Sequence, residues 1–355
     1  MIEIDGSYGE GGGQILRTAV SLSALTMKPI RITNIRTGRP KPGLKNQHIA
    51  GIKLTGMLVN ATIKGLDIGS STVEFVPHER RFGTFSYDVG TAGSISLVLQ
   101  AVLPPAVLSS EPVVFNLRGG TDVKWSPPID YLINVFTHTI AQMGPTIKIT
   151  QKKRGHYPRG GGIVSCEVVP ANEIKPLDQV EFGRLMKVSG ISHCVRLPGH
   201  IAERQASSAE DLIQMRLGVE PEIIRESYLK NNDTHLGPGS GIVIWGEDEH
   251  GIRLGSDMLG ERGKSAENVG NSAASLFIEE VSSEMAVDSH LCDMLIPYLA
   301  IASGTSRIGM TRSTSHLTTN IWATEHILGT QLDLQSKPNK SGVLTVKGLG
   351  LSVSE

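Results

Sequence analysis

The sequence has few cysteines and no long apolar run. Its three cysteines, Cys166, Cys194 and Cys292, are far apart and form no CxxC pair. This spacing argues against a disulfide framework or a cysteine zinc site, and it favours a reducing, cytoplasmic environment. No apolar run approaches the ~18 residues that a membrane helix needs. The acidic start, MIEIDGSYGE, also lacks the regions of a signal peptide. We therefore expect a soluble protein without a membrane partner.

Acidic residues are missing from one long segment. Between Glu10 and Asp67 no Asp or Glu occurs, whereas nine Lys and Arg residues fall there, so residues 1–66 carry a net charge of +6. Residues 203–290 instead have a net charge of −10, although the whole chain is nearly neutral at −1. This asymmetry indicates that the N-terminal part meets a polyanion, with a solvated basic face as the equally weighted alternative.

Several familiar catalytic and nucleotide-binding motifs are absent. In YGEGGGQILR, Gln14 stands where the third glycine of a dinucleotide-binding GxGxxG would be. In GERGKSAE, the first P-loop glycine would have to be residue 258, which is Met258. The sequence reveals no Ser-His-acid set, no cysteine with a partner and no metal-binding cluster. Covalent catalysis by a histidine is the chemistry that remains.

Glycine, by contrast, is abundant, with 40 among 355 residues, which indicates many tight turns. The length exceeds that of a usual single core, so two domains are expected. Four segments share one design, in which a short β-branched run leads through a Gly/Ser/Thr-rich turn into a helical pattern. They span residues 6–25, 87–103, 118–140 and 306–328. The design predicts layered α/β units that repeat within the chain, with helix N-termini able to converge on a phosphate site.

The pattern changes near residue 183. From there to residue 282, strands are expected at 185–195, 221–229 and 241–247, and helices at 202–217 and 263–281. About 100 residues are enough for a domain, and the α/β pattern of the first half resumes afterwards. We therefore expect a large domain in two parts, residues 1–182 and 283–355, interrupted by a smaller α/β domain, residues 183–282.

Two segments are candidates for binding phosphate. Residues 9–14 offer a backbone poor in Cβ atoms beside Glu10, a candidate Mg²⁺ ligand; a tight turn with an exposed glutamate is the equal alternative. The segment IRTGRPKPGLKNQH, residues 35–48, combines two arginines, two prolines and a Gln-His pair, which predicts a stiff loop with forked donors for oxyanions. It contains no aromatic residue, so backbone phosphates rather than bases are the expected contacts.

His316 is the candidate nucleophile. It lies one step from a stripe, Leu317, Ile321, Thr324 and Leu328, that predicts one face of a helix. In the first turn of that helix, the positive end of the dipole favours the neutral imidazole, which is the form that attacks phosphorus. A lone histidine is more often a cap or a core residue. The residues alone leave both interpretations open.

Eight segments occur in a fixed order along the chain. They are GSYGEGGGQILRTAVSLS, IRTGRPKPGLKNQH, GTAGSISLVLQAVLP, RGGTDVKWSPPIDY, HYPRGGG, LPGHIAER, GKSAENVG and SHLTTNIWATEHIL. Together they resemble the RNA 3′-terminal phosphate cyclases over essentially the whole chain. The resemblance implies an α/β (α+β) fold, with a large domain of three repeated βαβαββ-like units and a smaller inserted α/β domain. It also implies ATP as substrate and a divalent metal, Mg²⁺ or Mn²⁺. In the family, a histidine takes AMP from ATP, AMP moves to an RNA 3′-phosphate, and the 2′-hydroxyl closes a 2′,3′-cyclic phosphodiester.

The resemblance also assigns roles to individual residues. His316 corresponds to the histidine that carries AMP, and Glu10 to the carboxylate that contacts the metal. The chain departs from the family pattern at His290, which is tyrosine in some members, and at Met294, which is often glutamine. RNA 3′-phosphate ends are the implied partners, and the oligomeric state stays open between monomer and dimer. The remaining matched positions are Gln14, Arg17, Arg36, Arg39, Gln47 and His48 around the phosphates, and Gln100, Pro127, Tyr131, His290 and Asp293 around the nucleoside.

Two other functions compete with this interpretation. A non-catalytic, cyclase-like protein of ribosome biogenesis would lack the histidine and the residues around it. An α/β-repeat enzyme that transfers an enolpyruvyl group would need neither a nucleophilic histidine nor an ATP-binding set. Because the chain has His316, Glu10, Arg17, Arg36 and Arg39, we favour the catalytic cyclase.

Overall fold

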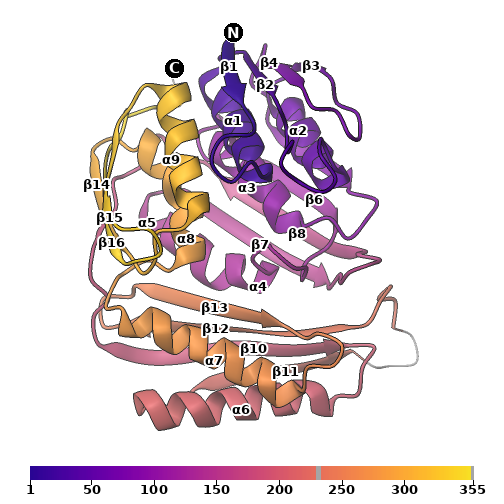
Figure 1. Cartoon of the computed structure of the whole chain (residues 1–355), viewed down its shortest axis with the longest axis vertical. Coiled ribbons are helices and arrows are strands. Elements are labelled where there is room, and N and C mark those ends of the chain that lie inside the picture. Colours follow the sequence, from indigo (N-terminus) through magenta and orange to yellow (C-terminus); the bar gives the residue numbers. More distant parts are fainter. Residues whose placement is uncertain (229–232, 353–355) are drawn as a thin grey trace.

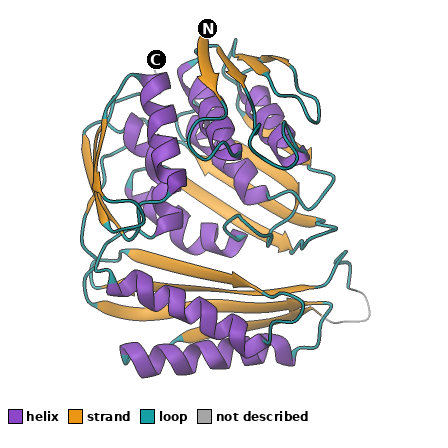
Figure 2. Ribbon diagram, in the orientation of Figure 1, coloured by secondary structure: helices purple, strands orange, loops and turns teal. Residues whose placement is uncertain are grey.

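The computed structural model describes residues 1–228 and 233–352. Within these ranges the strands form four mixed sheets of four strands each. Three sheets and their helices make up the upper body in Figure 1, and the fourth forms a separate layer below it (Figures 1 and 2). None of the helices in the described ranges has the length and apolar character needed to cross a bilayer.

The first unit has the element order βαβαββ. Its strands are arranged in the order β1-β2-β4-β3, with β1 parallel to β2 and the other neighbours antiparallel. Helices α1 and α2 pack against each other on this sheet. The elements are β1 (Ile2–Asp5), α1 (Gly13–Thr26), β2 (Ile30–Thr33), α2 (Asn46–Leu58), β3 (Thr62–Lys64) and β4 (Val73–Val76).

The second unit repeats this order. Its sheet runs β5-β6-β8-β7, again with the first pair parallel and the rest antiparallel. Its second helical stretch, residues 129–142, contains one π-helical turn. The elements are β5 (Gly83–Asp88), α3 (Ile95–Ala106), β6 (Val113–Gly119), α4 (Ile129–Tyr131), η1 (Leu132–Phe136), α5 (Thr137–Gln142), β7 (Thr146–Lys153) and β8 (Gly162–Val169).

The third unit has the same topology, although a long segment separates its first strand from its first helix. Its sheet runs β9-β14-β16-β15, with β9 parallel to β14 and the other pairs antiparallel. The predicted fold class, with three repeated βαβαββ units, is therefore confirmed. The elements are β9 (Asp178–Gln179), α8 (Ser289–Ile301), β14 (Thr305–Met310), α9 (Ser315–Leu328), β15 (Leu332–Ser336) and β16 (Gly342–Lys347).

The separating segment is the inserted α/β layer. Its sheet runs β11-β10-β12-β13, and α6 and α7 cover one face. Strand β13 was not expected from the sequence, and Leu229, predicted to end a strand, lies outside the described residues. The limits 183 and 282 remain a prediction. The elements are β10 (Leu185–Val195), α6 (His200–Leu217), β11 (Glu222–Tyr228), β12 (Gly239–Asp248), β13 (Arg253–Leu259) and α7 (Ala266–Ser282).

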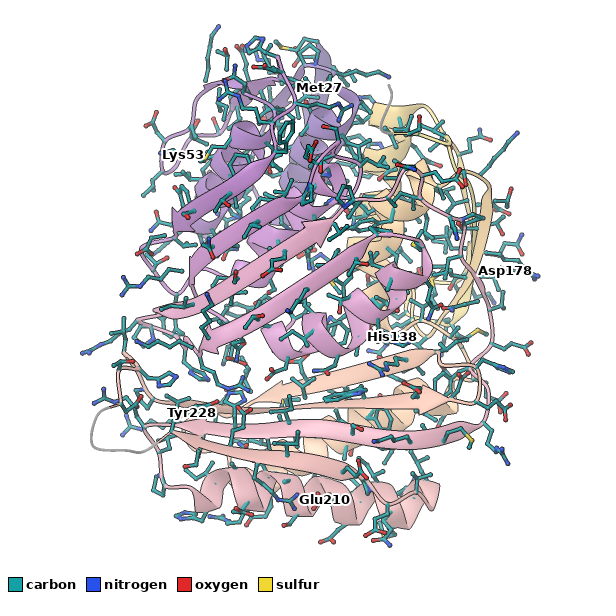
Figure 3. The ribbon with its side chains drawn as sticks, turned by 180° about the vertical axis from the view of Figure 1, so that it is seen from behind. Met27, Lys53, His138, Asp178, Glu210 and Tyr228 are labelled. Atoms are coloured by element: carbon teal, nitrogen blue, oxygen red, sulfur yellow. The ribbon has the colours of Figure 1, made fainter. Side chains whose placement is uncertain are left out.

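The inserted layer has an apolar core of its own and also packs against the body. Val188, Ala206 and Phe277 belong to the core between its sheet and its helices. Val243 and Leu254 face the other way and join the core of the body. Figure 3 shows the two sheets β5–β8 and β10–β13 in front of their helices, with His138 at the boundary between body and insert.

Candidate functional site

The N-terminal halves of four helices surround one pocket. Helices α1, α3, α8 and α9 line it, together with strand β13 of the insert and the loop between β6 and α4. The pocket has a volume of about 490 Å³. Seven of the residues predicted for the site line this pocket, namely Gln14, Arg17, Gln100, Pro127, His290, Asp293 and His316.

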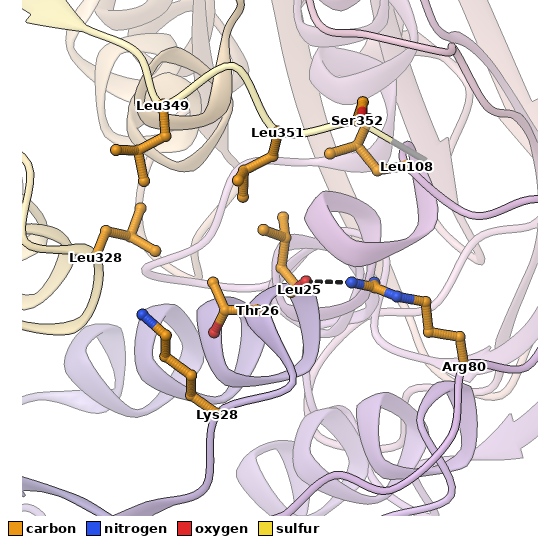
Figure 4. Close-up of a pocket in the computed structure, with 9 residues that line it drawn as sticks. All are labelled: Leu25, Thr26, Lys28, Arg80, Leu108, Leu328, Leu349, Leu351 and Ser352. Carbon is orange, nitrogen blue, oxygen red and sulfur yellow. Dashed lines mark hydrogen bonds between the residues drawn. The ribbon is translucent and has the colours of Figure 1, made fainter. Parts of the chain in front are cut away.

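A second cavity lies elsewhere and carries little chemistry. It has a volume of about 220 Å³ and is lined mainly by leucines near the C-terminal ends of α1 and α9 (Figure 4). Arg80 donates a hydrogen bond of 2.8 Å to the carbonyl oxygen of Leu25, so one side of its guanidinium is already occupied. The pocket that contains His316 is therefore the candidate active site.

Helix α9 presents His316 in its first turn. The Thr314 hydroxyl caps the helix by accepting from the Leu317 N–H at 3.0 Å, and Gly329 ends it in the left-handed conformation. The residues predicted for the apolar stripe, Leu317, Ile321, Thr324 and Leu328, are all buried, which confirms the predicted helix face. His316 lies beside this stripe with 47% of its side chain exposed.

Glu10 connects His316 to Arg39. His316 Nδ1 lies 2.7 Å from Glu10 Oε2, and Arg39 pairs with Glu10 Oε1. The contact with His316, and then the Arg39 pair, lower the pKa of Glu10 to about 2, although burial works in the opposite direction. The carboxylate is therefore ionised at neutral pH and favours a proton on Nδ1 of His316. Nε2 of the same ring makes no hydrogen bond to any described residue, so it is the nitrogen left open for reaction.

The glycines before α1 let several side chains approach the backbone closely. A Cβ on Gly13 would lie 2.5 Å from His48 Nε2, and one on Gly9 would overlap the Thr319 hydroxyl. Gly9 also has a φ of +60°, which favours glycine over other residues. The α1 N-cap, Gly12, has no side-chain cap, so the first N–H groups of α1 stay available to an anion.

Asp293 on α8 links helix α9, which carries His316, to the neighbouring helices. Its Oδ1 accepts a hydrogen bond of 3.1 Å from the Thr314 hydroxyl, and its carbonyl oxygen accepts one of 2.9 Å from Asn320. Asn320 in turn accepts from the Thr18 hydroxyl of α1. Burial raises the pKa of Asp293 to about 6, although the charges of His316, His290 and Arg17 favour ionisation. The starts of α1, α8 and α9 are thereby held in one arrangement.

Arg17 is a partly buried cation with few partners. It donates to Gln14 Oε1, whereas its buried Nε has no hydrogen-bond partner among the described residues. Burial lowers its pKa to about 10, and Asp293 and Glu10 only partly offset this effect. An incompletely paired guanidinium at the wall of a pocket is suited to an anionic ligand such as a phosphate.

His290 is a second positively charged group at the pocket, and it pairs with a residue of the insert. Its Nε2 lies 3.4 Å from Asp257 Oδ1 on β13. Although 49% of the side chain is exposed, desolvation of the ring disfavours its charged form. The interaction with Asp257 and the charges of Asp288 and Asp293 outweigh this effect and raise the pKa to about 9. His290 is therefore an imidazolium at neutral pH where some family members have tyrosine.

The other predicted residues surround the pocket without lining it. Arg36 points into its own loop, where it donates hydrogen bonds of 2.8 Å to the carbonyl oxygens of Lys41 and Gly43. Gln47 and His48 were expected in that loop but lie in the first turn of α2. Burial, followed by the charge of Arg17, lowers the pKa of His48 to about 3, so its ring is neutral.

Tyr131 lies in a different position from the one expected. It is fully buried, donates a hydrogen bond of 2.6 Å to Asp288, and presents its ring edge to His290 at 5.7 Å between ring centroids. Tyr131 therefore packs against His290 and does not itself line the pocket. The reason is its place on α4, which packs against β13, where a Cβ on Gly255 would touch the tyrosine ring.

Sequence reasoning missed the residues that the insert contributes and, apart from Pro127, those of the β6–α4 loop. Lys124 pairs with Glu261 at 3.0 Å across the boundary between body and insert. Trp125 is 94% exposed at the pocket with a φ of +62°, so the loop holds a large aromatic ring in solvent. Neither the pairing of distant segments nor the exposure of Trp125 leaves a local signal in the sequence.

Glu10 has the chemistry of a metal ligand. Its Oε1 accepts a hydrogen bond from Arg39, whereas its Oε2 lies 2.7 Å from His316 Nδ1 without a hydrogen-bond partner among the described residues, so both oxygens keep a lone pair for a cation. Mg²⁺ bound to a nucleotide usually takes only one or two protein carboxylates and completes its shell with phosphate oxygens and water. The residues present therefore fit a divalent ion held by Glu10 together with the phosphates of a ligand.

The fold and the pocket define a protein of three βαβαββ units with an inserted domain, whose helix N-termini and cations surround a pocket that contains a histidine. The family model for RNA 3′-terminal phosphate cyclase matches residues 8–334. The chain thus belongs to the RNA 3′-terminal phosphate cyclase family. This membership makes it an enzyme of the ATP-dependent ligase type.

Its relatives match along nearly their full length. The RNA 3′-terminal phosphate cyclase of Methanopyrus kandleri is 50% identical over 350 residues, which cover 99% of both chains. The protein of the same name from Staphylothermus marinus is 48% identical over 354 residues, again 99% of each chain. The one from Pyrococcus furiosus is 48% identical over 346 residues and 98% of each chain.

Proposed function

We propose that the protein converts an RNA 3′-phosphate end into a 2′,3′-cyclic phosphodiester with ATP, through AMP bound covalently to His316 and then to the RNA end. The observation that carries this proposal is the contact between His316 Nδ1 and Glu10, which leaves Nε2 open beside the pocket. An unprotonated ring nitrogen with its partner nitrogen held by a carboxylate is suited to nucleophilic attack.

In the first step, Nε2 of His316 attacks the α-phosphorus of ATP. The N–P bond forms as the bond from phosphorus to the pyrophosphate oxygen breaks, and pyrophosphate leaves. The ring becomes cationic, and the adjacent Glu10 carboxylate stabilises this charge. Arg17, Arg39 and the uncapped start of α1 supply positive potential for the phosphate oxygens.

In the second step, an oxygen of the RNA 3′-phosphate attacks the same phosphorus and displaces His316. AMP is now joined to the RNA end as an RNA(3′)pp(5′)A intermediate, which gives the 3′-phosphate a leaving group. The neighbouring 2′-hydroxyl then attacks the 3′-phosphorus, loses its proton and expels AMP. Because both groups belong to one ribose, this last step gains from proximity and needs mainly charge stabilisation.

A divalent ion, Mg²⁺ or Mn²⁺, would be held by Glu10 and the nucleotide phosphates. When bound, it neutralises phosphate charge and supports the departure of pyrophosphate. The basic N-terminal region, with its net charge of +6 over residues 1–66, supports RNA binding through backbone phosphates.

The test is a conversion assay with an RNA that carries a labelled 3′-phosphate. With ATP and Mg²⁺ or Mn²⁺, we expect the label to become resistant to phosphatase as the cyclic ester forms. Without ATP, it should stay sensitive. A protein that binds the RNA yet never produces the resistant end would be the non-catalytic alternative.

A further inference from the structure

A cluster of buried polar side chains lies apart from the pocket, where the second unit meets the insert. Asp122 follows β6, His156 lies between β7 and β8, and His193 belongs to β10 of the insert. All three are almost fully buried, with 2%, 5% and 1% of their surfaces exposed. Their ligand atoms lie within 4.8 Å of one another, which is unique among the described residues.

The distances within this cluster approach those of a metal site. The two Nε2 atoms are 3.1 Å apart. Asp122 Oδ1 lies 3.7 Å from His193 Nε2, and Oδ2 lies 4.0 Å from His156 Nε2. Two nitrogens bound to one tetrahedral zinc at ~2.05 Å would be about 3.3 Å apart. The imidazoles are already at that spacing, and the carboxylate needs only a small shift.

Both rings are available as neutral ligands. Burial, followed for His193 by the charge of Arg154, lowers the pKa of each histidine, although Asp122 opposes this effect. Each Nδ1 is buried without a hydrogen-bond partner among the described residues. The rings are instead oriented by packing, because a Cβ on Gly239 would overlap the His156 ring and one on Gly241 would lie 3.1 Å from His193 Cε1.

The charged side chains around the cluster include more carboxylates than cations. Arg154 lies 2.7 Å from Asp130 and 2.8 Å from Glu226, but 3.5 Å from Asp122. Three carboxylates thus face a single guanidinium, and Asp122 has the weakest contact with it. With both rings neutral, the buried cluster holds more negative than positive charge, which a divalent ion would balance.

We propose that Asp122, His156 and His193 bind one Zn²⁺ ion that joins the insert to the body of the protein. Two imidazole nitrogens and one carboxylate oxygen are a ligand set that zinc accepts, with a fourth position for water. The ion would also fix the loop that starts at Asp122 and carries Lys124 and Trp125 into the pocket. This site is separate from the catalytic divalent ion held by Glu10.

The experiment measures metal content on the full chain, purified without a histidine tag and without chelator. Inductively coupled plasma mass spectrometry should find about one zinc per chain. His193→Gln should reduce the zinc content to background. Glu10→Gln should keep it, which separates this site from the catalytic metal. His138→Gln is the matched control at the same boundary, since His138 Nε2 hydrogen-bonds the carbonyl oxygen of Gly251 at 2.7 Å and does not belong to the cluster, and it should also keep the zinc.

A second measurement uses the wild-type chain alone, in case His193→Gln fails to fold. After chelator treatment, titration with Co²⁺ should give the intense visible bands of a tetrahedral site and raise Tm, and Zn²⁺ should displace the cobalt. A wild-type protein that contains no zinc and takes up neither ion overturns the proposal. The same holds if His193→Gln folds and retains its zinc.

Discussion

Two histidine sites lie at boundaries in this fold, and they differ in access. His316 stands at the start of α9 with 47% of its side chain exposed, beside Glu10. His156 and His193 lie under the insert with side chains 6% and 1% exposed, beside Asp122. Each site pairs imidazole with a carboxylate, but only the first leaves a ring nitrogen open to a ligand in a pocket.

The comparison shows what distinguishes His316, the proposed nucleophile, from His156 and His193, the proposed zinc ligands. At His316, a carboxylate holds one nitrogen and the other faces a pocket large enough for a nucleotide. At His156 and His193, the two Nε2 atoms face each other, and neither ring lines the pocket that contains His316. Because all three residues are histidines, we infer their different roles from the solvent exposure of each ring and from the partner of each ring nitrogen.

The largest effect on the reactive site, short of removing the histidine, is expected for Glu10→Gln. The amide has no charge to stabilise the cationic ring, so covalent AMP formation should slow by about 10⁴-fold, as amide substitution does in the His-carboxylate pair of the serine proteases. Single-turnover labelling measures this rate. A variant that labels at the wild-type rate would show that the carboxylate is not needed.

The same residue predicts a pH dependence of stability. The pKa of Glu10 is lowered from 4.5 to about 2, first by its contact with His316. Its contribution to stability is therefore complete above pH 4.5 and is lost as the pH falls toward 2. Urea unfolding across this range should show a smaller loss for Glu10→Gln than for the wild type.

The next effect is expected for Arg17→Lys. Lysine keeps the charge but loses the forked donors, so kcat/KM for ATP should fall by about 100-fold. Arg80→Lys is the control, because Arg80 donates to Leu25 in the separate leucine-lined cavity and should leave the kinetics unchanged. Equal losses in both variants would point to a general loss of structure.

A smaller effect concerns His290 and its partner on the insert. The pKa of His290 is raised from 6.5 to about 9, so its stabilising contribution is complete below pH 6.5 and is lost as the pH rises through 9. Because the side chain is half exposed, we expect a loss of only about 1 kcal/mol over this window. Urea unfolding should show this loss in the wild type and little of it in Asp257→Asn. If the free energy of unfolding of Asp257→Asn falls with rising pH as steeply as that of the wild type, the pairing is contradicted.

The smallest effect is expected for Trp125→Ala. An exposed ring at the pocket can stack on a base, so its removal should raise KM for the RNA by about 5-fold with little change in kcat. Phe82→Ala, at an aromatic residue that is 54% exposed and does not line the pocket, is the control. Equal KM values for Trp125→Ala and wild type would exclude stacking.

Local patterns predicted the elements that are stabilised locally. The stripe from Leu317 to Leu328 defined the buried face of α9, and the turn-helix design indicated repeated α/β units, whose number, three, came from the family resemblance. Motif resemblance supplied seven of the residues that line the pocket. Tyr131 was expected there too, but its packing against Gly255 depends on how the insert docks, which no local pattern encodes.

Features built from distant segments were not predictable. Strand β13 joins the insert only through its pairing with β12, and its sequence, RLGSDML, lacks regular alternation of apolar and polar residues. The sequence revealed no metal-binding cluster, whereas the structure brings Asp122, His156 and His193 together from three separate elements. Neither feature has the short spacing on which motif recognition depends.

The most direct test of the central claim follows AMP onto the protein. The wild type and His316→Asn are incubated with α-labelled ATP and Mg²⁺ or Mn²⁺, and the labelled peptide is identified by mass spectrometry. We expect an acid-labile, alkali-stable AMP adduct on the peptide that contains His316, and no label on the variant. A wild type that takes no label under varied metal and pH, or a variant that still does, would contradict the account.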